Sequence, residues 1–294
     1  MRWARCSLHD GLAVRQRQHR KLFRPPLHGR YAGREDLRVE LTPTRDALGF
    51  CFGVTSSYAA VLPGVEAAFG ELAVGTGPVT VLDLDSYDDT GAINRLTKLL
   101  SDVTLGAITA AGGSLLLHAG AVARPDGATA VLCGASGSGK STLTAGLVTA
   151  GWAYVTDETV CLDPDTLRIT PFRRPLSIKA GSHQVLAYLR PDPAYAGSWV
   201  VPPSALKGPL LPGQPLLPEL LVFPTYRPGA RLEVTALSPG EAAFLAGTDS
   251  SRLADTREPL PSLARLARRA PAYRLVHGDL DVAVAAVSDL LAAA

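Results

Sequence analysis

The chain has 294 residues, of which 47% are hydrophobic and 19% charged, and its 28 glycines and 23 prolines follow no collagen-like period. This composition excludes a disordered or fibrous protein, and the length is sufficient for a buried core in one large domain or two ordinary ones. The net charge is +2, with +8 on residues 1–34 and −6 on the rest of the chain.

The basic head, residues 1–34, is open to two interpretations. A charge run of this kind predicts an unstructured, solvated tail or a segment upstream of the true start codon. The alternative is contact with a phosphate backbone or an acidic partner. The head has no continuous apolar run of the kind that secretory signals contain, so we expect no export signal. The negative charge of the rest of the chain argues against nucleic-acid binding there.

The sequence predicts a cytoplasmic protein that does not cross a membrane. Its four cysteines form no C-x-x-C pair, which favours reduced thiols and gives no zinc-site pattern. The longest apolar stretch, residues 105–123, contains His118 and four glycines. This stretch therefore predicts a helix end that leads into a buried strand, not a membrane span.

The first half of the chain predicts a small α/β subdomain over residues 35–112. Its apolar side chains are assigned to core packing, because no catalytic pattern occurs among them. An amphipathic helix over 92–111 ends at Gly112 and Gly113, which puts the boundary to a second domain, 113–294, near residue 112. The earlier predicted elements are strands over 38–41, 49–54 and 79–84 and a helix over 65–72.

Residues 134–141 read Gly-Ala-Ser-Gly-Ser-Gly-Lys-Ser and match the phosphate-loop pattern G-x-x-x-x-G-K-[ST] at every fixed position. A strand-like run at 128–133 precedes them and a helix over 141–150 follows, which is the order that the motif requires. The glycines let successive N–H groups point at phosphate oxygens, and the helix adds its positive N-terminal end. A flexible turn with a surface lysine is the alternative. The predicted nucleotide-binding residues are Gly134, Ser136, Gly137, Ser138, Gly139, Lys140, Ser141 and Thr142.

The loop predicts sites for ATP and Mg²⁺. We expect Lys140 to reach the β and γ phosphates and the Ser141 hydroxyl to bind Mg²⁺. The next apolar strand ends in Asp157 and Glu158. In a right-handed crossover this strand runs parallel to the one before the loop, so both acids emerge beside the phosphates. There one of Asp157 and Glu158 can accept the proton of an attacking hydroxyl, and the other can bind Mg²⁺ directly or through water; a solvent-facing turn is the alternative.

His118 is predicted to lie beside the same loop. The strand segments on either side of the turn at 124–127 form an antiparallel hairpin. With the turn centred in the middle of that tetrapeptide, His118 lies opposite Cys133. An active-site role and a satisfied core histidine both remain open at this point.

Four segments together resemble one known family: Leu117-His-Ala-Gly120, residues 134–142, Gly151-Trp-Ala-Tyr-Val-Thr-Asp-Glu158 and Pro171-Phe-Arg-Arg-Pro-Leu-Ser-Ile-Lys179. The family is the HPr serine kinase/phosphorylase C-terminal domain family, and the segments look most like those of the HPr-kinase-related kinases of peptide natural-product pathways, including lasso-peptide kinases. The resemblance is strongest over residues 113–183 and implies a P-loop kinase core of the HPr kinase/phosphoenolpyruvate carboxykinase type, an α/β mixed sheet with flanking helices.

The resemblance also implies roles for single residues. Asp157 matches the acid that accepts the proton of the target serine, Glu158 stands where the family usually has a second Asp, and His118 matches the active-site histidine. Family members that also catalyse phosphorolysis carry a Leu-Glu-Ile-Arg-Gly segment, whereas residues 176–180 of this chain read Leu-Ser-Ile-Lys-Ala. The missing acid argues against phosphorylase activity and against HPr as the substrate.

Arg173 and Lys179 are candidate contacts for the transferred phosphoryl group or an acidic substrate. Neighbouring side chains of an extended segment point in opposite directions, so we expect Arg173 and Arg174 not both to face inward. Residues 191–228 hold ten prolines and predict no regular ladder, but either a lid over the substrate or a rigid linker. Further predicted elements are strands over 220–223, 232–237 and 272–276, a capping box at 238–241 with a helix through 245, helices over 261–269 and 280–291, and His277 in a loop.

These observations predict an ATP- and Mg²⁺-dependent kinase that transfers the γ-phosphoryl group to a hydroxyl. The favoured acceptor is a serine of a peptide or small protein, and a homo-oligomer is compatible with the sequence. Two alternatives remain open. One is a nucleotide-binding regulatory module without phosphoryl transfer, and the other is a kinase for a small-molecule alcohol or a relative of the phosphoenolpyruvate carboxykinases.

Overall fold

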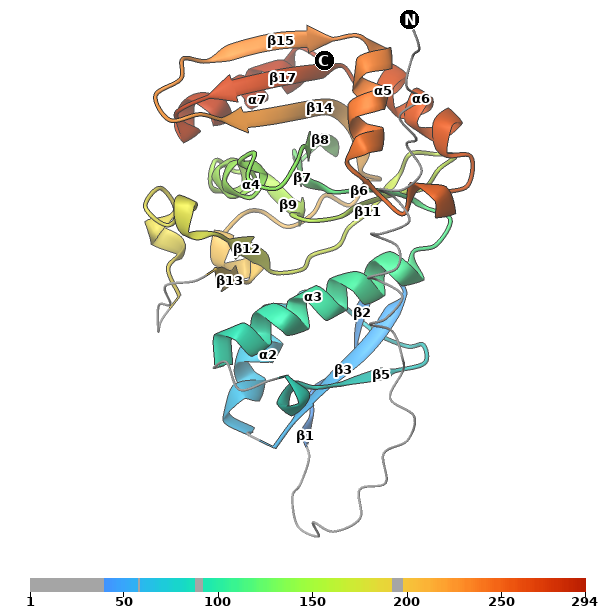
Figure 1. The fold of residues 1–294 in the computed structure, drawn as a ribbon, viewed down its shortest axis with the longest axis vertical. Helices are drawn as coiled ribbons and strands as arrows, with labels where there is room; N and C mark the ends of the chain where they lie inside the picture. Colours follow the sequence, from blue (N-terminus) through green and yellow to red (C-terminus); the bar gives the residue numbers. More distant parts are fainter. Residues whose placement is uncertain (1–39, 58, 88–91, 192–197) are drawn as a thin grey trace, which may run out of the picture. The chain divides into compact units, whose positions relative to one another are not determined.

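The computed structural model in Figure 1 describes residues 40–57, 59–87, 92–191 and 198–294. These residues belong to one unit of the chain, Val39–Ala294. The unit is a mixed α/β structure with several sheets and helices, as the sequence predicts. The basic head lies outside the described residues, and the domain boundary near residue 112 stays a prediction. In the described part of the chain, no helix is long and apolar enough to span a membrane.

The N-terminal sheet packs against two helices. Its strand order is β1-β3-β2-β4, and β5 pairs with β3 in parallel. Phe52 of β3 packs with Phe69 of α2 and Leu99 of α3. Helix α2 begins three residues before the predicted start, because Pro63 in its first turn suits a helix N-terminus. The elements are β1 (Glu40–Leu41), β2 (Arg45–Ala47), β3 (Phe50–Ser56), η1 (Ala59–Val61), α2 (Leu62–Phe69), β4 (Ala73–Val74), β5 (Thr80–Asp83), η2 (Leu84–Ser86) and α3 (Ala92–Ala110).

The hairpin before the phosphate loop forms as predicted, but its register differs by one residue. Ala119, not His118, lies opposite Cys133. Gly127 adopts a left-handed conformation with φ of 90°, which lengthens the turn to three residues and moves its centre. His118 therefore lies one position beyond the last pair. The hairpin strands are β7 (Ala119–Ala123) and β8 (Ala128–Cys133), whereas β6 (Leu115–Leu117), just before them, belongs to a different sheet.

The largest sheet has six strands in the order β15-β17-β14-β8-β7-β9. Strands β8, β14 and β17 are parallel to one another, whereas β7 is antiparallel to both of its neighbours, β8 and β9. Strands β8 and β9 therefore run in the same direction, as the predicted crossover requires. The additional strands are β9 (Ala153–Thr156), β14 (Leu217–Tyr226), β15 (Glu233–Leu237) and β17 (Ala272–His277).

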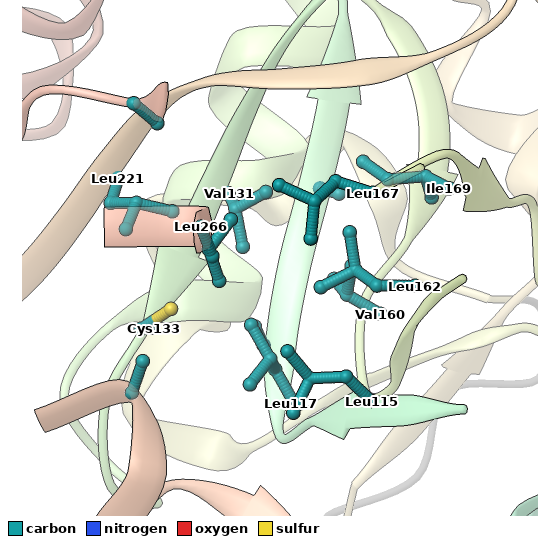
Figure 2. Close-up of a cluster of buried hydrophobic side chains, with 14 of the residues drawn as sticks. Leu115, Leu117, Val131, Cys133, Val160, Leu162, Leu167, Ile169, Leu221 and Leu266 are labelled. Carbon is teal, nitrogen blue, oxygen red and sulfur yellow. The ribbon is translucent and has the colours of Figure 1, made fainter. Parts of the chain in front are cut away.

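Both faces of this sheet are buried, which explains the apolar run of β8. Val131 and Cys133 face the core shown in Figure 2, where Leu266 of α6 packs. Ala130 and Leu132 face a second core with α4 and α7. The helices are α4 (Lys140–Thr149), α5 (Pro239–Thr248), α6 (Pro259–Arg269) and α7 (Leu280–Ala292). Helix α5 opens with the predicted capping box of Ser238 and Glu241.

Two smaller sheets complete the structure. One has the order β11-β10-β6-β16 and packs in the core of Figure 2; the other pairs β12 with β13. The remaining elements are β10 (Val160–Leu162), β11 (Ile169–Thr170), β12 (Leu176–Ile178), η3 (Ala180–Ser182), η4 (Ala187–Leu189), β13 (Trp199–Val201), η5 (Pro203–Leu206), β16 (Ser250–Ser251) and η6 (Leu253–Asp255). Cys51, Cys133 and Cys161 are buried free thiols.

The prediction that residues 191–228 form no ladder is wrong, because β13 and β14 lie in this segment. Two of its prolines occur where a strand tolerates the loss of an N–H group. Pro218 lies at a shift in register between β14 and β8, and Pro224 lies beyond the last pair of these two strands. His277 is also not in a loop as predicted, but is the last residue of β17.

Candidate functional site

Five chain segments converge at one edge of the six-stranded sheet. The carboxyl ends of β8, β9, β14 and β17 share this edge, and the antiparallel β7 begins there. Along the edge, the order is His277, Tyr226, the phosphate loop, His118 and Asp157. A cavity of about 960 Å³ lies here. Among the predicted site residues, its walls include His118, Ser136, Gly137, Gly139, Lys140, Ser141, Thr142, Asp157, Glu158 and Lys179.

The phosphate loop has the backbone and the inward-facing cation that an anion site needs. Gly134, Gly137 and Gly139 adopt positive φ angles of 143°, 89° and 99°, which residues other than glycine rarely adopt. Lys140 is only 6% exposed and its ammonium group donates to the carbonyl oxygens of Gly134 and Ala135. Burial lowers the pKa of Lys140, while nearby carboxylates oppose this effect. An entering phosphate can replace these carbonyls as the partner of the ammonium group.

Two further features of the loop fit a phosphate. The buried Ser138 hydroxyl has no hydrogen-bond partner among the described residues. The space in front of Gly137 is open, since a Cβ atom placed there would meet no atom within 4 Å. The first turn of α4 also directs amide groups without intrahelical partners toward the loop. Residues 134–142 therefore fit the triphosphate that the motif predicts.

Asp157 is a buried carboxyl group beside Ser141. It is 2% exposed, and its Oδ1 atom has no hydrogen-bond partner in the described part of the chain. Burial raises the pKa of Asp157 from 3.8 to about 7, although Arg174 and a hydrogen bond from Ser141 act in the opposite direction. This carboxyl group therefore gains and loses its proton near neutral pH, as a proton acceptor in catalysis should.

Glu158 binds two cationic or protonatable side chains. Its Oε1 atom is 3.0 Å from Nδ1 of His118 and its Oε2 atom is 3.3 Å from Nη1 of Arg174. Burial raises the pKa of Glu158, but His118 and Arg174 outweigh burial and lower it to about 2. Glu158 is therefore ionised at every working pH. With both oxygens engaged, it is less suited to bind Mg²⁺ than the sequence suggests.

Of the two arginines after β11, Arg173, the predicted substrate contact, does not line the cavity of about 960 Å³, whereas Arg174 contacts Glu158 in its wall. Arg173 donates from Nε to Oε2 of Glu71 at 3.0 Å and from Nη1 to the carbonyl oxygen of Tyr154. It lines a separate cavity of about 320 Å³. Arg174 is 4% exposed and reaches Glu158. The two neighbouring side chains thus have different partners, as expected for an extended segment, but alternation alone does not determine which of the two reaches the site.

Lys179 lies where the sequence predicts it. Its ammonium group donates to the Ser136 hydroxyl at 2.7 Å. Next to it, the hydroxyls of Thr142 and Ser182 share a hydrogen bond of 2.6 Å. These two contacts connect the segment after β12 to both ends of the phosphate loop, and so they form one wall of the cavity.

Sequence reasoning missed four residues around the site. Besides Arg174, they are Tyr226, His277 and Asp249. Tyr226 and His277 line the cavity from the ends of β14 and β17, and the shared edge of parallel strands was the signal that could have found them. The carbonyl oxygen of Asp249 accepts the main-chain N–H of His118 at 2.7 Å, a contact for which the sequence carries no local signal.

The residues present fit a magnesium ion that is bound jointly with a phosphate. Among the described residues, no group of three or more His, Cys, Asp or Glu side chains could hold a metal ion. Mg²⁺ in phosphate loops does not require such a group, because it keeps waters and takes phosphate oxygens as ligands. The Ser141 hydroxyl, in the first turn of α4, is the side-chain donor that fits this ion.

Comparison with known proteins assigns the chain to no family. No family model matches the chain, and a search of the curated proteins finds no match.

Proposed function

We propose that this protein is an ATP- and Mg²⁺-dependent kinase that transfers the γ-phosphoryl group to a hydroxyl, with a serine of a peptide or small protein as the acceptor. One observation carries the proposal: a buried carboxyl group with a pKa near 7, Asp157, shares a cavity with a complete phosphate loop. A loop that only binds a nucleotide has no need of a proton acceptor with its pKa adjusted to working pH.

The loop residues bind and orient the phosphates. The glycine backbone and the first turn of α4 offer N–H groups, and Lys140 adds a positive charge that is already desolvated. When bound, Mg²⁺ supplies charge that offsets the charge of the phosphate oxygens during transfer. Fixed donors in a partly buried cavity cost little reorganisation as the reaction proceeds.

Asp157 takes the proton of the acceptor hydroxyl. Its ionised form is the competent base, and a pKa near 7 keeps about half of the molecules ionised at neutral pH. Glu158 stays ionised because of His118 and Arg174. Its negative charge raises the pKa of Asp157 and so makes Asp157 a stronger base. His118 is held by Glu158 at the cavity wall, in reach of the acceptor side of the phosphates.

The direct test is phosphoryl transfer. The purified chain is incubated with Mg²⁺, ATP labelled in the γ position, and a set of serine-containing peptides together with small alcohols. We expect a mass gain of one phosphoryl group on a serine peptide, and no gain with Lys140→Ala. Label on a small alcohol alone would replace the peptide acceptor, and label released only as free phosphate would favour the regulatory module.

A further inference from the structure

The cavity extends to both sides of the phosphate loop. Asp157 and His118 lie on one side, whereas Tyr226 and His277 lie on the other. Asp157 follows β9 and His277 is the last residue of β17, and these strands are four spacings apart in the sheet, which corresponds to about 19 Å. A ligand that fills this length is extended, with its reacting end at Asp157 and its other end near β14 and β17.

Tyr226 presents an aromatic ring at the far end of the cavity. Its main-chain N–H donates to the carbonyl oxygen of Ser138 at 3.1 Å, which attaches it to the phosphate loop. A Cβ atom placed on Gly139 would lie 3.3 Å from that of Tyr226. The residue is 48% exposed and lines the cavity. A half-exposed ring next to a phosphate site is suited to stack on a planar base.

His277 offers an unused hydrogen-bond acceptor beside that ring. It is 3% exposed, and its ring lies 5.7 Å from the ring of Tyr226. Nδ1 is 3.0 Å from the carbonyl oxygen of Asp279, so it carries the proton and donates. Nε2 is then an acceptor, and it has no partner among the described residues. Burial lowers the pKa of His277, although the Asp279 contact opposes this, and a lowered pKa favours the neutral ring.

We propose that Tyr226 and His277 form the subsite for the nucleoside part of the bound triphosphate. The base stacks on the Tyr226 ring, and an N–H or O–H group of the nucleoside donates to Nε2 of His277. Nε2 of a neutral His277 accepts a hydrogen bond and does not attract a phosphate oxygen. This end of the cavity therefore favours the nucleoside, whereas the loop favours the phosphates. Because Nε2 is buried, access of the nucleoside to this atom requires the neighbouring, half-exposed Tyr226 side chain to move aside. The inference rests on the proposed function, because the loop must hold the phosphates.

The first experiment separates the nucleoside from the phosphates. Binding of ATP and of inorganic tripolyphosphate is measured with Mg²⁺ for the wild type, Tyr226→Ala and Tyr188→Ala. Tyr188 is a matched control, since it is 56% exposed and does not line the cavity. We expect Tyr226→Ala to weaken ATP binding about tenfold and to leave tripolyphosphate binding unchanged. Equal loss for both ligands, or equal loss in Tyr188→Ala, would overturn the subsite.

The second experiment tests His277 with 2′-deoxy-ATP, 3′-deoxy-ATP and purine riboside triphosphate, which lacks the amino group. Each analogue lacks one group of ATP that could donate to Nε2. In the wild type, we expect the analogue that lacks the actual donor to bind about three- to tenfold more weakly than ATP. His277→Ala binds ATP and that analogue equally, and His277→Gln, whose amide oxygen can accept, restores part of the difference. Retained discrimination in a folded His277→Ala protein would overturn the role. A wild type that binds neither ATP nor tripolyphosphate refutes the proposed function itself.

Discussion

Replacing Asp157 with asparagine should weaken catalysis and stabilise the fold. Asparagine has nearly the same shape but carries no charge and cannot accept the hydroxyl proton. We therefore expect ATP binding to persist while transfer falls by about 10²- to 10⁴-fold, the usual contribution of a positioned acid–base group. In the wild type, transfer should increase as the pH rises through about 7, because the ionised form of Asp157 is the base.

The effect on stability follows from the same pKa. Burial raises the pKa of Asp157 from 3.8 to about 7, which corresponds to about 4 kcal/mol. A carboxyl group whose pKa is raised on folding contributes most to stability below pH 3.8, and this contribution is lost as the pH rises through about 7. The Asp157→Asn variant has no ionisable carboxyl group at this position, so it does not lose stability in this way as the pH rises. Its free energy of unfolding, relative to the wild type, should increase by up to about 4 kcal/mol between pH 4 and pH 8.

Urea unfolding across this pH range measures the difference directly. Asp289→Asn, on the exposed face of α7, is the matched control, since it makes the same substitution outside the cavity. A pH-independent difference for Asp157→Asn would mean that the carboxyl group is not desolvated as described. Unchanged transfer would remove Asp157 as the proton acceptor, even if the stability result agreed.

Two further predictions concern residues around the site. Arg173→Met should leave the kcat and KM of transfer unchanged but lower the free energy of unfolding by about 1–3 kcal/mol, because the Glu71 carboxylate loses its partner. Adding Glu71→Gln should recover part of this loss of stability. A large rise in KM would contradict the position of Arg173 outside the site. Gly120→Ala should destabilise the protein by about 1–3 kcal/mol, since its Cβ would lie 2.5 Å from the Thr144 hydroxyl of α4. Thr144→Ala, which removes that hydroxyl, should rescue Gly120→Ala in the same urea assay, and additive losses would refute the proposed clash.

Local patterns were sufficient to predict most of the elements. The phosphate loop with its strand and helix, the capping box at Ser238 and the helix of α7 depend on neighbours within a few residues, and they occur where the sequence places them. The position of Asp157 could also be predicted from the sequence, because the handedness of the crossover determines the edge of the sheet at which its strand ends.

Properties that depend on distant partners were not predictable in the same way. Arg174 turns toward Glu158 and Arg173 toward Glu71, and neither acid is a near neighbour of these arginines in the sequence. The register at His118 differed by one residue because the left-handed Gly127 added a position to the turn. His277 was assigned to a loop because strand ends are poorly defined by hydrophobic pattern alone.

The position of His118 has a consequence for how this chain can change over evolution. The residue is the single step by which the backbone leaves one sheet, in which Leu117 pairs with Val160, and enters another, in which Ala119 pairs with Cys133. Deleting or inserting one residue at this step would invert the inward and outward faces of a strand on one side or the other. The strand pairings on either side of His118 therefore fix the position of its imidazole relative to the phosphate loop. At this point in the chain, substitutions can be tolerated, whereas insertions and deletions cannot.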